Sequence, residues 1–461
     1  MLAKAIVNRL KQIVGDKNVI TSKVALIAYG YDATLLAGMP VGVVFPGNTE
    51  EVVELVKAAS ELDFTLVPRG AGTNLSGGAL GDVNSTSVVI AFSRMKKIWE
   101  IDTENFLATI EPGYVNFEFQ EELAKKGFYY PPDPASYKAA TMGGNLGECS
   151  GGPRCFKYGV TRDYVLGLEV VLMNGKVIQT GGRNFKSECG LDLTRIFVGA
   201  EGTLGLITKV TVRILPLPPA KRTMLAIFHK AENASQTVAD IVAAGIVPTT
   251  LEMMDGLMMI IAEDANNIGL PRDAGALLII EVDGYDVDLD GQVNTISDIC
   301  AKNNVREFKL ARTAQEVDKI WLARRTAIGA CGKRRPSYSM QDITVPRSVF
   351  PAAVSGIIQC ASDLSLEIGI LAHAGDGNFH PMVLFDQRLE DESHRVHQAE
   401  GILCRMALDL KGSITGEHGI GLLKKPFMDK QFSPVGLEVF RKIKRSFDPA
   451  NRLNPGKIID L

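Results

Sequence analysis

The segment Ile370-Leu-Ala-His-Ala-Gly-Asp-Gly-Asn-Phe-His-Pro381 constrains the fold more than any other stretch of this chain. It contains Asp376-Gly377, a dipeptide that is a strong signal for a tight turn between two antiparallel strands. A turn at this dipeptide places His373 directly opposite His380. The Cβ atoms of such cross-strand partners lie roughly 5 Å apart, so the two imidazoles converge on one point. The segment therefore predicts a β-hairpin whose paired histidines suit a bound metal ion.

A second polar motif, Thr415-Gly-Glu-His-Gly-Ile-Gly421, sets a carboxylate and an imidazole among glycines. On an extended backbone, neighbouring side chains point to opposite sides, so Glu417 and His418 are expected to face different partners. Paired histidines alone are also compatible with buried core residues whose hydrogen bonds are satisfied. Because Glu417 and His418 accompany them, the two motifs together predict a metal-assisted or acid–base active site.

Charge and cysteine content exclude several classes of protein. The formal net charge of −3 gives no electrostatic reason to expect binding to nucleic acid or to an anionic membrane. No apolar run approaches the roughly 18 residues of a membrane-spanning helix. The first ten residues predict an amphipathic helix rather than a signal peptide, so we expect a cytoplasmic protein. The seven cysteines include no C-x-x-C pair, which argues against a disulfide framework and against an iron–sulfur cluster bound by this chain.

The patterns of apolar residues predict an α+β chain. Asn48 is an expected helix N-cap, with Glu51 three residues further on. Asn174-Gly175 predicts a hairpin turn. The proline-rich segment Leu215–Ala220 is the best candidate for a domain boundary. Strands are expected at 64–68, 87–92, 107–111, 168–180 (as a hairpin) and 277–282, and helices at 292–302, 312–330 and 393–410.

Glycine is clustered in the first half of the chain. Arg69-Gly-Ala-Gly-Thr-Asn-Leu-Ser-Gly-Gly78 follows a predicted strand and offers a run of backbone amides able to bind an anion. The run does not match the dinucleotide fingerprint, which would need glycine at Leu75, and it contains no Gly-Lys-Ser/Thr for a P-loop. An ordinary glycine-rich turn is the alternative for this cluster taken alone. A second irregular run of glycine, proline and small residues covers 131–159, and so long a segment favours a functional role.

Several motifs, in order along nearly the whole chain, resemble one flavoprotein family. Those of the first half resemble the FAD-binding domain of the vanillyl-alcohol-oxidase type, and those of the second half resemble the glycolate oxidase D-subunit and D-lactate dehydrogenase branch. The motifs are Pro68-Arg-Gly-Ala-Gly-Thr-Asn-Leu-Ser-Gly-Gly78, Pro132-Asp-Pro134, Thr141-x-Gly-Gly-Asn145, Tyr158-Gly-x-Thr-Arg-Asp163, Gly199-x-Glu-Gly-Thr-Leu-Gly205, His373-x-Gly-Asp-Gly-Asn-x-His380, Gly416-Glu-His-Gly419 and Phe447-Asp-Pro-x-Asn-x-x-Asn-Pro-Gly-Lys457.

The resemblance implies an α+β protein with three parts. These are an N-terminal helical segment at 1–35, a two-subdomain FAD-binding domain at 36–217, and an α+β substrate-binding or cap domain with an antiparallel sheet at 218–461. The C-terminus of the last part is expected to return to the flavin site.

The resemblance also implies that FAD binds noncovalently, with its pyrophosphate on the first glycine cluster and its isoalloxazine on the second. No histidine precedes His229, so histidyl attachment in this domain is excluded, while Cys149 and Cys155 leave cysteinyl attachment open. The cofactor-binding residues implied are Pro68, Arg69, Gly70, Ala71, Gly72, Thr73, Asn74, Gly78, Pro132, Asp133, Ser136, Thr141, Gly144, Asn145, Gly152, Tyr158, Gly159, Gly202, Ile207 and Asn454.

Oxidation of a 2-hydroxy acid removes a hydroxyl proton and moves a hydride to flavin N5, and a base near pKa 7 or a Lewis acid assists it. His373, His380 and Glu417 form the expected His₂Glu site with an open position, which Zn²⁺, Fe²⁺ or Mn²⁺ would accept. By resemblance, His418 is the general base. Arg324, within Trp321-Leu-Ala-Arg-Arg325, is the residue expected to bind the substrate carboxylate.

The resemblance implies a D-2-hydroxy-acid dehydrogenase, with D-lactate as first substrate and glycolate as second. Related D-2-hydroxyglutarate enzymes carry a lysine before an Asp-x-x-x-Pro segment, whereas this chain has Met340-Gln-Asp-Ile-Thr-Val-Pro346, which disfavours a dicarboxylate. Because the chain has no nicotinamide fingerprint, electrons are expected to pass to a protein partner, either an electron-transferring flavoprotein or an iron–sulfur subunit. The alternative is a non-catalytic flavin subunit of such a complex.

Overall fold

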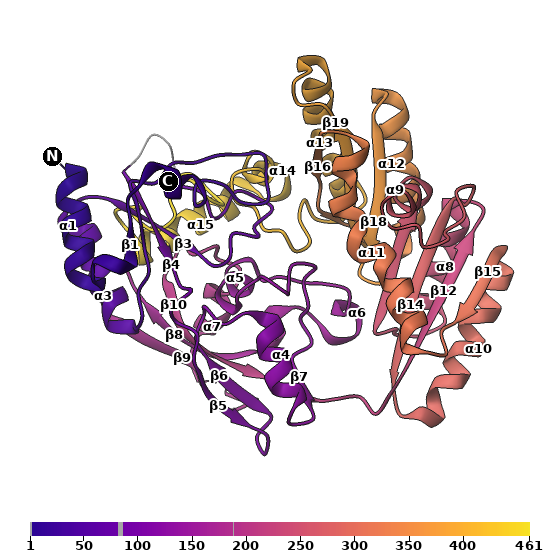
Figure 1. Cartoon of the computed structure of the whole chain (residues 1–461), viewed down its shortest axis with the longest axis horizontal. Helices are drawn as coiled ribbons and strands as arrows, with labels where there is room; N and C mark the ends of the chain where they lie inside the picture. The colour runs from indigo at the N-terminus through magenta and orange to yellow at the C-terminus, as the bar shows by residue number, and fades with distance from the viewer. Residues whose placement is uncertain (1, 82–85, 188) are drawn as a thin grey trace. The chain divides into compact units, whose positions relative to one another are not determined.

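The computed structural model describes residues 2–81, 86–187 and 189–461 (Figure 1). The chain divides into two compact units. The first unit comprises Met1–Gly151, Val160–Leu217 and Glu417–Leu461, and the second comprises Gly152–Gly159 and Pro218–Gly416. The chain therefore passes from the first unit to the second within the proline-rich segment, and returns to the first at the Glu417-His418 motif.

The first unit contains two main sheets, as expected for a two-subdomain FAD-binding domain. One has the strand order β1-β2-β4-β3, in which β2, β4 and β3 are parallel. The other has the order β5-β6-β10-β8-β9 and is antiparallel throughout. The elements are α1 (Leu2–Val14), β1 (Val19–Ile20), α2 (Lys23–Ile27), β2 (Gly42–Val44), α3 (Thr49–Glu61), β3 (Thr65–Arg69), β4 (Ser87–Ala91), β5 (Ile98–Asp102), β6 (Leu107–Ile110), α4 (Asn116–Ala124), β7 (Phe128–Tyr129), α5 (Met142–Glu148), β8 (Val165–Val171), β9 (Val177–Gly181), α7 (Leu193–Phe197), β10 (Leu206–Arg213), β11 (Leu215–Pro216), α14 (Met428–Gln431) and α15 (Pro434–Phe447).

Local sequence signals explain several of these elements. Asn48 caps α3 as predicted, because its side-chain oxygen accepts a hydrogen bond of 2.8 Å from the Glu51 amide. The apolar residues of α3 recur at helical spacing and are buried against the first sheet. The hairpin of β8 and β9 turns at Asn174-Gly175, also as predicted. The C-terminal segment after α15 joins the parallel strands of the first sheet, where Leu453 forms a parallel bridge with Leu66 of β3.

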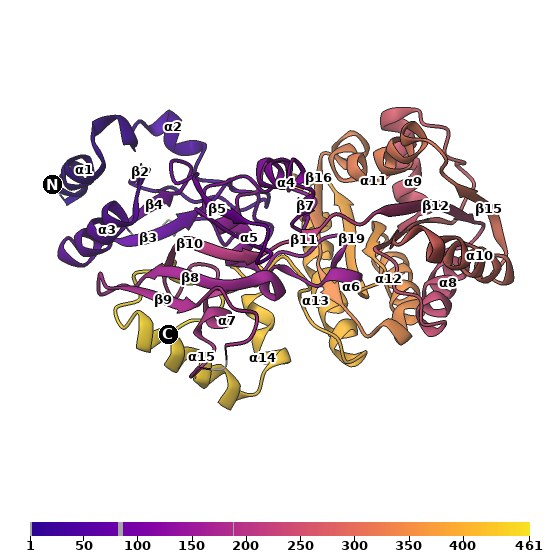
Figure 2. The ribbon, with the colours of Figure 1, turned by 90° about the horizontal axis from the view of Figure 1, so that it is seen from below.

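The second unit is built on one eight-stranded antiparallel sheet of order β15-β12-β14-β13-β18-β19-β16, with β17 also paired to β19. Figure 2 shows helices on both faces of this sheet, with α9 and α11 on one face and α8, α12 and α13 on the other. Within the described residues, no helix is long and apolar enough to cross a bilayer. The elements are α6 (Cys155–Tyr158), β12 (Ala220–Phe228), α8 (Ala231–Ala243), β13 (Thr250–Asp255), α9 (Gly256–Asn266), β14 (Ala276–Gly284), α10 (Asp286–Lys302), β15 (Val305–Leu310), α11 (Ala314–Arg334), β16 (Ser337–Met340), β17 (Ile343–Thr344), α12 (Phe350–Leu364), β18 (Glu367–His373), β19 (Asn378–Phe385) and α13 (Glu390–Asp409).

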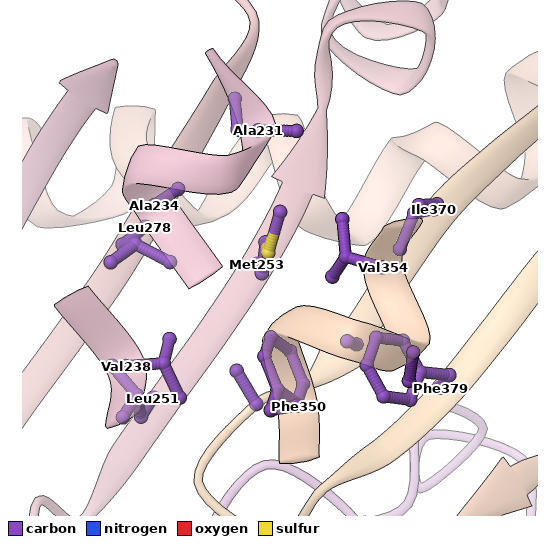
Figure 3. Close-up of a cluster of buried hydrophobic side chains, with 14 of the residues drawn as sticks. Ala231, Ala234, Val238, Leu251, Met253, Leu278, Phe350, Val354, Ile370 and Phe379 are labelled. Carbon is purple, nitrogen blue, oxygen red and sulfur yellow. The ribbon is translucent and has the colours of Figure 1, made fainter. Parts of the chain in front are cut away.

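The largest apolar cluster of this unit fixes the two histidine-bearing strands. Figure 3 shows Phe379 of β19 beside Phe350 of α12, and their rings stack with centroids 4.3 Å apart. Side chains alternate along a strand, so burial of Phe379 on this face places His380 on the opposite face, which α9 and α11 cover. The same alternation places His373 on the α11 face, because its neighbour Ala372 belongs to the apolar cluster.

The predicted hairpin forms, but its predicted register is wrong by two residues. His373 pairs with Asn378, and His380 pairs with Leu371, so the two histidines are diagonal neighbours rather than direct partners. The turn is a four-residue loop, 374–377, that begins with a hydrogen bond of 3.1 Å from the Asp376 amide to the His373 carbonyl. Because a shift of two residues keeps every side chain on its own face, both imidazoles still share one side of the sheet.

Candidate active site

The structure brings the two glycine clusters of the first unit together. A Cβ atom on Gly70 would collide with the Thr141 hydroxyl, so the first loop lies directly on the N-terminus of α5. Thr141 caps that helix by accepting a hydrogen bond from Gly144. Gly202 packs equally closely against the ring of Pro68 at the end of β3. Residues from three separate motifs therefore meet at one end of the parallel sheet.

Two asparagines shape the first glycine loop. The Oδ1 atom of Asn74 accepts a hydrogen bond of 2.7 Å from the Gly78 amide. The Nδ2 atom of Asn454 donates to the carbonyls of Gly78, at 2.8 Å, and of Glu201, at 2.7 Å. The C-terminal motif thus ties the loop to the Gly199–Gly205 motif, and the interaction that the structure shows for Asn454 is with the protein backbone.

This loop has the donors that a diphosphate requires. Arg69 is 6% exposed, and its Nη1 atom has no hydrogen-bond partner among the described residues. The backbone amides of Ala71, Gly72 and Thr73 likewise donate to no other group in that part of the chain. A buried cation beside consecutive amide donors is complementary to a dianionic group. The residues predicted to cradle the FAD pyrophosphate therefore fit that role.

The other predicted cofactor residues lie in four parts of the chain. Asp133 and Ser136 belong to a loop that is held on α4 by a hydrogen bond of 3.0 Å from Asn116 Nδ2 to the Pro132 carbonyl. Asn145 is buried within α5, and Ile207 is half-buried on β10. Gly152, Tyr158 and Gly159 lie in the second unit, where the Tyr158 hydroxyl is 3.0 Å from both carboxylate oxygens of Asp283.

In the second unit, the two hairpin histidines face each other. The ring centroids of His373 and His380 are 5.0 Å apart, and the rings are nearly perpendicular. Each residue is only 3% exposed. Two imidazoles at this separation can both direct a nitrogen at one cation.

A buried glutamate that was not predicted from the sequence links this pair to Arg324. Glu252 of β13 is the direct cross-strand partner of His373 and is 0% exposed. Its Oε1 atom lies 2.5 Å from His373 Nδ1, and its Oε2 atom accepts a hydrogen bond of 2.8 Å from Arg324 Nε. Burial alone would raise the pKa of Glu252, but attraction to His373 and Arg324 outweighs it and lowers that pKa.

Asp342, which is 1% exposed, was also missed as a site residue. Its Oδ1 atom lies 3.8 Å from His380 Nδ1 and accepts a hydrogen bond of 2.7 Å from Asn378. Its Oδ2 atom accepts a hydrogen bond of 2.7 Å from the Gly416 amide. Asp342 therefore fixes the last residue of the second unit close to His380, and Glu417 is the next residue along the chain.

Glu417 and His418 begin the last segment of the first unit. The expectation that their side chains diverge is wrong, since His418 Nε2 lies 4.0 Å from Glu417 Oε1. The backbone here bends between glycines rather than extending, and Gly419 adopts a φ of 80°. Both side chains remain partly accessible, at 12% each.

Glu201 holds the loop that follows His418, and Glu148 lies against the same loop. The oxygens of Glu201 accept hydrogen bonds from the amides of Ile420, at 2.6 Å, and Gly421, at 2.8 Å. A Cβ atom on Gly419 would collide with Glu148 and would lie 2.9 Å from Glu201 Oε1. Burial raises the pKa of Glu201 to about 7, and burial next to Glu201 also raises the pKa of Glu148. The hydrogen bonds of Glu201 hold the backbone at Ile420 and Gly421 and thereby restrict the position of His418.

Comparison with known proteins identifies both halves of the chain. Residues 40–181 match the family model described as an FAD binding domain, and residues 217–458 match the model described as the C-terminal domain of FAD linked oxidases.

Individual relatives cover almost the whole chain. The glycolate oxidase subunit GlcD of Bacillus subtilis is 42% identical over 459 residues, which are 99% of this chain and 97% of that protein. A probable mitochondrial D-lactate dehydrogenase of Danio rerio is 32% identical, over 99% of this chain and 92% of its own. The structure of p-cresol methylhydroxylase with substrate bound superposes with a TM-score of 0.82 at 18% identity, covering 100% of this chain and 97% of that one, and so shares the fold.

Proposed function

Because this chain belongs to the FAD-linked oxidases, we propose that it oxidises a small D-2-hydroxy acid to the 2-oxo acid, with D-lactate as first substrate and glycolate as second. The chain is an FAD-dependent oxidoreductase that acts on CH–OH groups. The observation that carries the proposal is the buried contact of Glu252 with both Arg324 and His373, because it sets a carboxylate-binding cation beside a pair of metal-binding side chains.

Arg324 is assigned to the substrate carboxylate. It is 5% exposed, and within the described residues its single hydrogen bond leaves from Nε, to Glu252. Its two terminal nitrogens therefore remain available. A guanidinium fork binds a carboxylate through two parallel hydrogen bonds, and this sets the orientation of the substrate as well as its affinity.

His373, His380 and Glu417 are assigned to a divalent metal ion, Zn²⁺, Fe²⁺ or Mn²⁺. The imidazole pair fits such an ion, because each ring is buried and has a carboxylate near Nδ1, namely Glu252 for His373 and Asp342 for His380. The Gly416 contact with Asp342 supports Glu417 as the third ligand. A bound ion would act as a Lewis acid that lowers the pKa of the substrate hydroxyl.

His418 is assigned as the general base that removes the hydroxyl proton. Bound FAD would supply the acceptor for the hydride from C2, and the alcohol carbon, having lost two electrons, would become a carbonyl. His418 then holds the proton at its imidazole, and Arg324 keeps the carboxylate of the product in place.

The preference for a monocarboxylate is supported by the residue before Asp342. Related hydroxyglutarate enzymes are expected to have a lysine there, whereas Gln341 donates a hydrogen bond of 2.9 Å to Glu400. D-2-hydroxyglutarate is therefore third among the substrates. The partner proposed is an electron-acceptor protein, either an electron-transferring flavoprotein or an iron–sulfur subunit, and the relative named as a glycolate oxidase subunit supports a complex.

Steady-state oxidation with a dye acceptor tests the substrate and the partner together. The purified FAD-loaded chain is expected to show its highest kcat/KM with D-lactate, followed by glycolate. Fastest oxidation of D-2-hydroxyglutarate would contradict the substrate assignment. Rapid H₂O₂ formation without the dye would contradict a protein acceptor. No turnover of any hydroxy acid with FAD bound would favour the non-catalytic flavin subunit.

A further inference from the structure

Glu252 is a buried charged residue whose own role has not yet been stated. It stands in the middle of β13, between Leu251 and Met253, which are 1% and 0% exposed. A carboxylate at such a position is stable only when its partners replace the lost solvent. Its two oxygens have separate partners, His373 and Arg324, which are the two residues assigned to metal and to substrate.

The contact with His373 determines which ring nitrogen faces outward. A carboxylate accepts hydrogen bonds and cannot donate them, so Glu252 Oε1 requires the proton of the neutral ring at Nδ1. The Nε2 atom of His373 is then unprotonated and can bind a metal ion. A carboxylate behind a ligating histidine also orients the ring and raises its basicity.

The contact with Arg324 fixes the guanidinium that is assigned to the substrate carboxylate. Glu252 Oε2 holds the guanidinium at Nε, on the inner edge of the fork. The edge formed by the two terminal nitrogens is a different edge of the planar guanidinium and can bind a second carboxylate. One rigid side chain therefore sets the distance between the metal ligand and the carboxylate clamp.

We propose that Glu252 is a positioning residue that couples metal binding to substrate binding, by fixing the tautomer of His373 and the direction of Arg324 with one carboxylate. This inference rests on the proposed function. It predicts that a single change at Glu252 weakens two separate binding events, which a purely structural role would not do.

Glu252→Gln is the decisive variant, because glutamine has nearly the same shape and no charge. If its amide nitrogen faces His373, it donates to Nδ1 and leaves the proton on Nε2, which blocks metal binding. If its amide oxygen faces His373 instead, the amide nitrogen faces the Arg324 Nε–H, donor against donor. Either orientation breaks one of the two interactions, and loss of the negative charge weakens the other, because a neutral amide is a poorer partner than a carboxylate for both groups. Glu252→Asp keeps the charge but is one methylene shorter, so partial recovery is expected.

Glu281→Gln is the matched control. Glu281 on the adjacent strand β14 is also buried, at 4% exposed, and it also binds α11, through a hydrogen bond of 3.0 Å from Trp321 Nε1. Its other contacts are with Thr223, at 2.6 Å, and Lys221, at 3.2 Å. It therefore resembles Glu252 in burial and in helix anchoring, but contacts neither His373 nor Arg324.

The experiment measures zinc affinity by competition with a chelator, binding of pyruvate from the change it causes in the flavin spectrum, and KM and kcat for D-lactate. Glu252→Gln is expected to lower zinc affinity about 10- to 100-fold, the usual effect of removing a carboxylate behind a ligand. It is also expected to weaken pyruvate binding and raise KM about tenfold, with FAD retained. Glu281→Gln is expected to match the wild type in all of these.

Two outcomes would overturn the inference. One would remove only the positioning role of Glu252, and the other would also overturn the proposed function. A wild type that binds metal and oxidises D-lactate, with Glu252→Gln indistinguishable from Glu281→Gln, would remove the positioning role alone. A wild type that neither binds metal nor oxidises any hydroxy acid would overturn the proposed function and the inference with it. Loss of zinc affinity and of pyruvate binding only in the Glu252 variants would support the coupling.

Discussion

Arg324 and Arg325 are neighbours on α11, but their side chains leave the helix in different directions. Arg324 is buried, whereas Arg325 lies on the surface. Arg325 is exposed, and its guanidinium lies 5.7 Å from the centre of the Trp321 ring. Arg324 points inward to Glu252. The choice of Arg324 over Arg325 for the substrate carboxylate can therefore be tested by parallel substitutions.

Arg324→Lys is expected to raise KM for D-lactate about 10- to 100-fold, with a smaller change in kcat. Lysine loses the planar fork and the Nε contact, and a charged hydrogen bond contributes about 1.5–3 kcal/mol. Steady-state kinetics of the purified variant measure the effect. Arg325→Lys should leave KM unchanged, and an equal rise in both variants would contradict the assignment.

The second prediction for a single residue concerns Gly419, in the loop after His418. Gly419→Ala adds a methyl group that must displace Glu148 or Glu201. We expect kcat to fall at least about tenfold, since a displaced catalytic group loses its alignment, while FAD stays bound. The measurement is turnover together with the flavin absorbance of the purified variant.

Gly456→Ala separates this collision from backbone strain. Gly456 has a similar φ of 76°, but nothing lies within 4 Å of an added Cβ atom. Both variants incur about 1–2 kcal/mol of left-handed strain, and only the Gly419 variant has the steric collision. Equal loss of kcat in the two variants would show that strain alone, and not the contact with the carboxyl pair, is responsible.

Individual residues of the candidate site were predictable only where they occur in a motif. His373, His380, Glu417 and His418 stand in short runs with unusual spacing. Glu252 lies 121 residues from His373 in sequence, inside a strand where its neighbours on both sides are apolar, and its only signal was a charge between apolar residues. Its partner is defined by strand pairing, which single-sequence patterns do not determine.

At the scale of elements, the N-cap of α3 and the hairpin of β8 and β9 were predicted correctly, because their signals are local. The caps of α3 and the turn of β8 and β9 follow from two or three adjacent residues. The register of β18 and β19 was wrong because Asp376-Gly377 occupies the second half of a four-residue loop rather than a two-residue turn. The packing of Phe379 on Phe350, which no local pattern encodes, is consistent with the observed register.

The N-cap of α9 leads to a pH prediction. Burial raises the pKa of Asp255 to about 7, although the amides of Met258 and Ile370 bind its carboxylate. Because the folded form holds the proton more tightly than the unfolded chain, this group's contribution to stability is complete below its ordinary pKa of 3.8. That contribution is lost as pH rises through about 7.

Asp255→Asn should therefore gain stability relative to the wild type as pH rises from 4 to 7, because asparagine caps a helix as well as aspartate and does not ionise. The expected gain in Tm at pH 8 over pH 5 is on the order of a few degrees. Asp192→Asn, at the exposed N-cap of α7, is the control and should show no such trend. A pH-independent difference for Asp255→Asn would contradict the prediction.

At the scale of the whole molecule, the two-unit α+β architecture followed from the family resemblance, which covered both halves. The convergence of the glycine motifs was expected from that resemblance, and the structure accounts for it through the close approach of Gly70 to Thr141. The place of Gly152–Gly159 in the second unit did not follow from local sequence. It depends on contacts such as that of Tyr158 with Asp283, which is 125 residues away.

Treatment with a chelator should separate the role of the proposed metal ion from that of FAD. Dialysis against a strong chelator is expected to abolish D-lactate oxidation while FAD stays bound, because the predicted flavin donors of the first unit do not include His373 or His380. Addition of Zn²⁺, Mn²⁺ or Fe²⁺ should restore turnover. Elemental analysis before and after dialysis provides the check, and full activity in metal-free protein would remove the metal from the mechanism.

The most direct test of whether this chain oxidises a 2-hydroxy acid is anaerobic reduction of its bound flavin by candidate substrates. The FAD-loaded, metal-loaded chain is mixed without oxygen with D-lactate, L-lactate, glycolate or D-2-hydroxyglutarate, and flavin absorbance is followed. If the chain is a D-2-hydroxy-acid dehydrogenase, we expect rapid bleaching by D-lactate, slower bleaching by glycolate, and none by L-lactate. Absence of bleaching by all four acids, with FAD and metal both present, would contradict the assignment of this chain as a hydroxy-acid dehydrogenase.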